Sequence, residues 1–81
     1  GKIKLNNPHQ MMVGNQYKIT EPDYDEDGPE INKPSFVEVV KKMKRGFILK
    51  DTEYDFTFER GFQHLMTCEI EEVYNMNKNE I

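Results

Sequence analysis

An acidic segment in the first half of the chain carries the residues whose types and spacing most resemble a binding site. Residues 23 to 30 read Asp-Tyr-Asp-Glu-Asp-Gly-Pro-Glu, with three aspartates at alternate positions and then a glycine. This is the opening of the calcium-loop pattern, in which carboxylate oxygens bind the cation and the glycine permits a sharp turn. Asp23, Asp25 and Asp27 are therefore candidate calcium ligands.

The remainder of the calcium-loop pattern does not follow. Counting from Asp23, the twelfth position, which needs a bidentate glutamate, is Pro34. Without that ligand we expect a dissociation constant of about 10⁻⁴ to 10⁻³ M, too weak for a cytosolic sensor. The pattern therefore favours a solvated or partner-binding acidic segment, with weak calcium binding as a second alternative.

The charges of the chain are sorted into two segments, although the net charge is only −4. An acidic run between residues 21 and 30 precedes a basic run between residues 41 and 50. The predicted partner-binding residues of the first run are Glu21, Asp23, Tyr24, Asp25, Glu26, Asp27 and Glu30. The predicted phosphate-binding residues of the second run are Lys41, Lys42, Lys44, Arg45, Phe47 and Lys50.

The acidic run predicts a non-catalytic module that binds a basic protein surface. Clustered carboxylates steer a cationic partner through their local potential and imitate the charge of a nucleic-acid backbone. A small inhibitor or adaptor of the phage type would use this chemistry. Tyr24 would serve as the exposed aromatic anchor of the interface.

The basic run supports an alternative, a small barrel that binds nucleic acid. Its cations would neutralise phosphates, which makes binding sensitive to salt, and Phe47 would stack on a base. The acidic sequence pI of about 5.1 argues against this alternative, since nucleic-acid-binding domains are usually basic.

Catalytic and zinc chemistry find little support in the sequence. Cys68 follows His64 by four residues, so the two would form a nucleophile and base only if that segment were helical. The neighbouring Glu69 would raise the thiol pKa and make the sulfur less reactive. Together with His9 these residues are too few for a zinc site, so we predict no enzyme activity and no cofactor, and no metal apart from the weak calcium alternative at Asp23, Asp25 and Asp27.

The composition predicts one small cytoplasmic domain. The chain has 81 residues, enough for a single core. A single cysteine excludes an internal disulfide, and no apolar run approaches the length of a membrane span. We expect a partly ordered lead-in at 1–12, the domain at 13–74 and a disordered tail at 75–81.

Alternating apolar residues predict an all-β fold. Residues 16–20 read as a first strand, and 54–58 alternate aromatic and polar side chains, which predicts a strand whose aromatic face is buried. Residues 62–65 read as a short helical turn, and a last strand begins at Met66. The segment 35–45 is ambiguous, because a capping box formed by Ser35 and Glu38 favours a helix. Its three valines, and a turn at Arg45-Gly46, favour a strand paired in a hairpin.

The predicted fold is therefore a small five-stranded barrel or a bent antiparallel sheet, with an α+β fold as the alternative if 35–45 is helical. The order of strand, long loop, hairpin, strand, turn and strand resembles small barrels of the Src-homology-3 type, including Tudor and KOW modules. The resemblance lies in the segments VGNQYKI, FVEVV, GFILKD, YDFTFERGF and CEIEEV. It implies that the acidic segment is the long loop between the first two strands, often a binding element in such barrels. The chain has no tryptophan, so it lacks the aromatic pair that binds proline-rich ligands.

Overall fold

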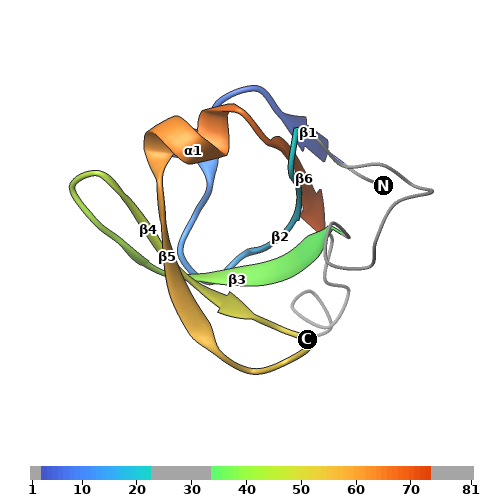
Figure 1. Cartoon of the computed structure of the whole chain (residues 1–81), viewed down its shortest axis with the longest axis vertical. Helices are drawn as coiled ribbons and strands as arrows, with labels where there is room; N and C mark the ends of the chain where they lie inside the picture. Colours follow the sequence, from blue (N-terminus) through green and yellow to red (C-terminus); the bar gives the residue numbers. More distant parts are fainter. Residues whose placement is uncertain (1–2, 23–33, 74–81) are drawn as a thin grey trace, which may run out of the picture.

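The computed structural model describes residues 3–22 and 34–73 of the chain. Within these ranges the strands form one antiparallel sheet in the order β1-β6-β2-β3-β4-β5. The elements are β1 (Ile3–Leu5), the 3-10 turn η1 (Pro8–Gln10), β2 (Gln16–Thr20), β3 (Ser35–Lys42), β4 (Gly46–Asp51), β5 (Thr57–Gly61), α1 (Phe62–Met66) and β6 (Glu69–Val73). The sheet bends around the core without closing into a barrel, and α1 lies across one open end (Figure 1).

The all-β prediction is confirmed, and the bent sheet is the correct one of the two arrangements. The sheet has six strands in the described residues, because β1 lies in the segment expected to be a lead-in. β1 pairs with β6, with Leu5 opposite Ile70. Its three residues are too short to give an alternating pattern, so the sequence offered no signal for it.

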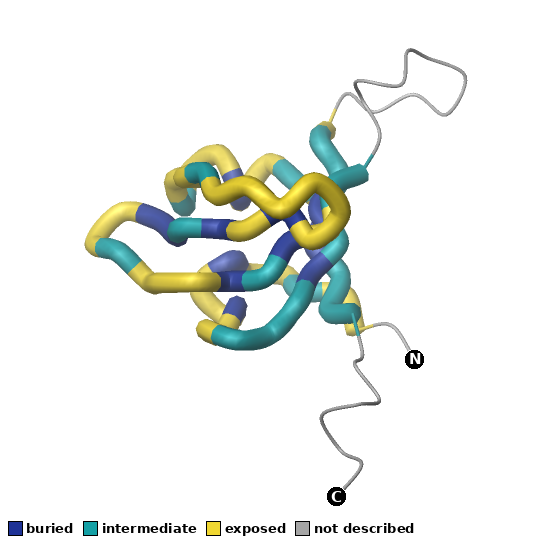
Figure 2. The backbone as a smooth tube through the Cα atoms, turned by 90° about the horizontal axis from the view of Figure 1, so that it is seen from below, coloured by how far each residue is buried: buried dark blue, intermediate teal, exposed yellow. Residues whose placement is uncertain are grey.

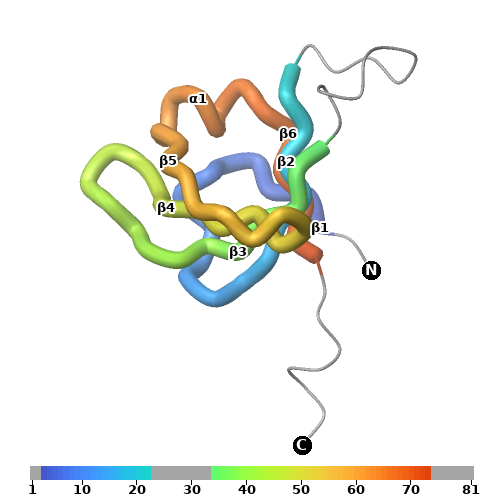
Figure 3. The backbone as a smooth tube through the Cα atoms, turned by 60° about the horizontal axis from the view of Figure 1, so that its bottom comes forward, coloured from blue at the N-terminus to red at the C-terminus, as the bar shows by residue number. Residues whose placement is uncertain are grey.

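The ambiguous segment 35–45 contains a strand and not a helix. Val37 and Val39 are fully buried at alternate positions of β3, whereas Phe36 and Val40 are each 43% exposed. A bulge lies between Val39 and Lys41, where the register with β4 shifts by one residue. The β3–β4 hairpin that follows was predicted from Arg45-Gly46 and projects from the body of the domain (Figures 1 and 3).

Among residues 3–22 and 34–73, nine buried apolar side chains form the core, and they come from most of the elements. They are Met11, Tyr17, Ile19, Val37, Val39, Phe47, Leu49, Leu65 and Ile70. Tyr17 is also satisfied as a polar group, because its hydroxyl accepts a hydrogen bond from the Met12 backbone N–H at 2.8 Å. The buried stretches gather in the middle of the molecule, and the projecting hairpin end is mostly exposed (Figure 2).

The prediction that one face of residues 54–58 is buried is wrong for its first two aromatics. Tyr54 is 71% exposed and Phe56 is 50% exposed, and only Phe58 packs against the core. The reason is a turn that delays β5 until Thr57. The Asp51 carboxylate accepts hydrogen bonds from the N–H groups of Glu53 and Tyr54, both at 2.9 Å, and so holds the backbone in the turn.

The last part of the chain also differs from the expected pattern. The helical turn predicted at 62–65 is present as α1, but it includes Met66, which the sequence assigned to the last strand. β6 therefore begins at Glu69 instead. In the described residues, no helix is both long and apolar enough to cross a membrane.

Candidate functional site

The acidic segment falls almost entirely outside the described residues. This applies to the predicted partner-binding and calcium-binding residues Asp23, Tyr24, Asp25, Glu26, Asp27 and Glu30. Only Glu21, directly after β2, can be placed. The protein-binding role of the acidic segment therefore rests on the sequence alone and stays a prediction.

The basic hairpin, defined as Lys41, Lys42, Lys44 and Arg45, lies at the exposed end of β3 and in the turn to β4. All four side chains are exposed, and none forms an ion pair with a carboxylate in the described part of the chain. A backbone hydrogen bond closes the turn of the hairpin, in which the Met43 N–H donates to the Gly46 carbonyl at 2.8 Å. No carboxylate among the described residues therefore occupies its cations.

Two other residues of the predicted phosphate-binding set interact within the domain instead of facing a ligand. Phe47 is only 1% exposed, which excludes the stacking role predicted for it. Lys50 forms an ion pair with Asp55, with 2.9 Å between Nζ and Oδ1. The hydrogen bond and the negative charge of Asp55 raise the pKa of Lys50. Lys50 is therefore already paired within the domain.

Two surface depressions adjoin the hairpin, and Arg45 and Gly61 border both. One, of about 450 Å³, is lined by Lys44, Arg45, Gly61, Phe62 and Gln63. The other, of about 290 Å³, is lined by Met43, Arg45, Gly46, Phe47, Glu59, Arg60 and Gly61. Cationic side chains at the borders of a shallow depression suit an anionic group of modest size.

Two aromatic side chains lie at the start of β5, the strand that runs toward the hairpin: Phe56 directly precedes it and Phe58 is within it. Phe56 and Phe58 have ring centroids 5.6 Å apart, and the Arg60 guanidinium lies 4.7 Å from the Phe58 centroid. Arg60 is opposite Phe47 in the β4–β5 register, next to the Gly46–Gly61 pair at the hairpin end. The alternation that the sequence assigned to the core thus leaves aromatic and cationic groups side by side on the surface.

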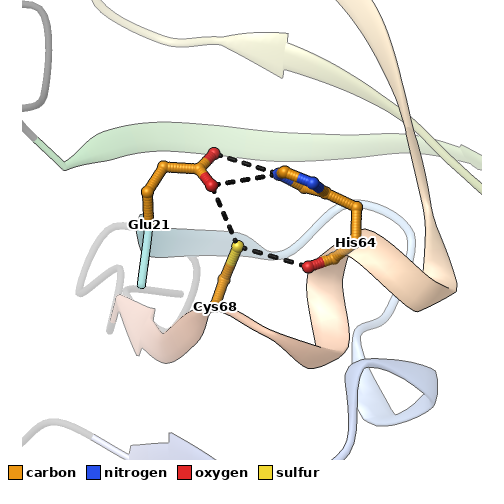
Figure 4. A group of neighbouring side chains, drawn as sticks. All are labelled: Glu21, His64 and Cys68. Atoms are coloured by element: carbon orange, nitrogen blue, oxygen red, sulfur yellow. Dashed lines mark hydrogen bonds and ion pairs between the residues drawn. The ribbon is translucent and has the colours of Figure 1, made fainter. Parts of the chain in front are cut away.

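A second group of side chains, the thiol cluster, consists of Glu21, His64 and Cys68. Its oxygen, nitrogen and sulfur atoms all lie within 4.8 Å of one another. His64 Nε2 is 3.0 Å from Glu21 Oε2, and the Cys68 thiol donates to the same oxygen at 3.5 Å. Figure 4 shows the three side chains pointing toward one another from β2, α1 and the start of β6.

The β2–β6 pairing explains why these distant residues meet. Thr20 pairs with Glu69, so continuing the antiparallel register brings Glu21 beside Cys68. His64 lies within α1, and Cys68 follows the end of that helix by two residues. The sequence argument considered the histidines and the cysteine and missed Glu21, 43 residues away from His64. Once strand pairing is known, the missing partner can be found.

The thiol cluster does not favour nucleophilic chemistry. Burial and the nearby Glu21 carboxylate both raise the pKa of Cys68, which favours the unreactive thiol. The thiol donates to Glu21 and, at 3.5 Å, to the His64 backbone carbonyl, not to the imidazole. The arrangement therefore lacks the thiolate–imidazole pair of cysteine nucleophiles.

Comparisons of the chain with models of known protein families, with curated proteins and with solved structures find no match. The functional argument therefore rests on the geometry of the two sites.

Proposed function

We propose that this domain is a non-catalytic binding module whose partner is single-stranded nucleic acid, held by the basic hairpin and by Phe56 and Phe58, the aromatic side chains just before and within β5. The observation that carries the proposal is the basic hairpin itself, four exposed cations without carboxylate partners in the described residues. Lysines that only keep a sheet soluble need not be concentrated at one end of a hairpin. A group of free cations raises the local potential even on a chain of negative net charge.

The exposed aromatics supply the second part of this surface. Proteins that bind single strands combine cations for the phosphates with aromatic faces on which bases stack. Phe56 is half exposed and directly precedes β5, Arg60 lies over Phe58 within β5, and that strand ends beside Arg45. The strand order also resembles that of small Src-homology-3, Tudor and KOW barrels, which supports a binding role over a catalytic one.

The test is fluorescence anisotropy with a labelled single-stranded oligonucleotide of about 15 nucleotides at about 50 mM salt. The double charge reversal Lys42→Glu with Lys44→Glu should weaken binding at least tenfold. The matched control, Lys4→Glu, changes an exposed lysine of β1 in the same way and should leave affinity within twofold. If four phosphates are neutralised, log affinity should fall with log salt at a slope of about −3.

A Phe56→Ala variant separates stacking from charge. It should weaken binding without changing the salt slope, because it removes a ring and no cation. Absence of binding at low salt would contradict the proposal. Equal losses from the hairpin and Lys4 reversals would also contradict it, as would binding of an acidic protein surface in preference to the oligonucleotide.

A further inference from the structure

We propose that the thiol cluster is a binding site for a divalent cation of the zinc type. Glu21, His64 and Cys68 offer one oxygen, one nitrogen and one sulfur, the three ligand atoms that zinc accepts in proteins. Three protein ligands with a water in the fourth position form a complete tetrahedral set. This inference concerns a different part of the molecule from the basic hairpin and does not depend on nucleic-acid binding.

The distances suit a shared cation. Zinc lies about 2.0 to 2.3 Å from such ligands, so the ligand atoms of a tetrahedral site are about 3.3 to 3.6 Å apart. In the cluster, the Cys68 sulfur is 3.5 Å from Glu21 Oε2, and His64 Nε2 is 3.0 Å from the same oxygen. All three ligand atoms lie within 4.8 Å of one another, and rotation of the partly exposed Glu21 and His64 side chains would bring the nitrogen and the sulfur to the spacing of a tetrahedral site.

The backbone around the cluster is held in place, so the ligands are already gathered before a cation arrives. Glu21 follows a strand paired on both sides, β2 with β3 and β6. The Cys68 N–H donates to the Leu65 carbonyl at 3.1 Å, and Leu65 is buried in the core. Side chains of Glu21 and His64 remain 39% and 47% exposed, which leaves an entry path and room for a water ligand.

In the cluster, protons on Cys68 and His64 form the hydrogen bonds to Glu21, and a bound cation would take the place of these protons. On binding, the Cys68 S–H bond loses its proton to solvent and the sulfur forms a bond to the cation. His64 Nε2 gives up the proton that it shares with Glu21, the neutral imidazole then carries its one proton on Nδ1, and the freed Nε2 lone pair binds the cation. The carboxylate exchanges its hydrogen bonds for a bond to the same cation. The sulfur and imidazole select zinc or cobalt over calcium and magnesium, which prefer sets of oxygens.

A bound cation would link the residue after β2 to α1 and to the residue before β6. Glu21 directly follows β2, His64 lies in α1, and Cys68 directly precedes β6. Binding would then stabilise the folded state, because the unfolded chain does not hold the three ligands together.

The first measurement is a cobalt titration of chelator-treated protein, followed by absorption spectroscopy. Cobalt should give a thiolate-to-cobalt charge-transfer band and intense visible bands typical of four-coordination. Cys68→Ser should lose the charge-transfer band, and His64→Gln or Glu21→Gln should raise the dissociation constant at least about tenfold. Glu53→Gln removes an exposed carboxylate of the β4–β5 turn and is the matched control.

The second measurement is thermal melting, which keeps the test decisive if the Cys68 variant folds poorly. Zinc at a hundredfold excess over its dissociation constant should raise the melting midpoint by at least about 10 °C, and calcium should not. Glu21→Gln and His64→Gln should reduce the zinc effect, while Glu53→Gln should retain it. A missing charge-transfer band in the folded wild-type protein, or equal responses to zinc and calcium, would overturn the proposal.

Discussion

The basic hairpin and the thiol cluster use polar side chains in opposite ways. In the hairpin, cations stand at the exposed end of two paired strands and meet no carboxylate within the described residues. In the cluster, three polar groups from β2, α1 and β6 are turned toward one another and are partly shielded from solvent. Exposed cations without a described carboxylate partner can bind an anionic macromolecule. Side chains that converge on one point can instead bind a single metal ion. The difference shows that local sequence can build the first kind of site but only strand pairing can build the second.

The strongest test of the division between core and surface compares two phenylalanines. Phe47 is buried where β4 leaves the hairpin turn, and Phe56 is half exposed in the connection between β4 and β5. Phe47→Ala should lower the free energy of unfolding by about 3 to 5 kcal/mol, because it leaves a cavity in the core. Phe56→Ala should lower it by less than about 1 kcal/mol. Urea denaturation measures both, and similar losses would contradict the placement of these rings.

The second prediction concerns the two glycines that face each other where β4 meets β5. A Cβ atom on Gly46 would lie 2.8 Å from the Gly61 Cα and closer still to the Arg60 carbonyl oxygen. Gly46→Ala should therefore cost about 1 to 3 kcal/mol of unfolding free energy. Gly61→Ala is the control, since its Cβ would meet the Arg45 carbonyl at an ordinary 3.5 Å. If thermal melting shows Gly61→Ala to be the more damaging change, the hairpin geometry is wrong.

The third prediction concerns the reactivity of Cys68 in metal-free protein. Its pKa is raised above the ordinary value of 9.0, first by burial and then by the Glu21 carboxylate. Alkylation at pH 8 should therefore be several-fold slower in folded than in unfolded protein, because less thiolate is present. Glu21→Gln should recover part of the rate, which mass spectrometry can follow.

The raised pKa of Cys68 also determines how the free energy of unfolding changes with pH. The folded protein retains the thiol proton at a pH where the unfolded chain has lost it, so the unfolding free energy falls as pH rises above about 9. Cys68→Ser should flatten this fall. A stability that increases between pH 8 and 10 would contradict the assigned environment of Cys68.

The smallest expected effect is that of the Lys50–Asp55 ion pair. Both side chains are well exposed, at 46% and 79%, so solvent and salt screen their attraction. Lys50→Met should change the melting midpoint less than any substitution above. It should also leave oligonucleotide affinity within twofold, since Lys50 is already paired. A large loss of affinity would extend the contact surface from the hairpin along β4.

Much of the fold could be predicted because it depends on local patterns. Alternating apolar residues predict β2, and the valines with Arg45-Gly46 predict the β3–β4 hairpin, because a strand buries every second side chain. The alternation from Tyr54 to Phe58 was misleading for a physical reason. The Asp51 carboxylate caps the following turn, and this local hydrogen bonding competes with strand formation.

By itself, the sequence determined the all-β character of the domain and the grouping of its cations, because periodicity and composition act between near neighbours. Only the tertiary structure decided that Phe47 is buried while Phe56 is exposed, that Ile3–Leu5 forms a sixth strand, and that Glu21 meets Cys68. Each of these depends on pairing between segments far apart in the chain. Such pairing is selected by the packing of the whole sheet, which no short window of sequence contains.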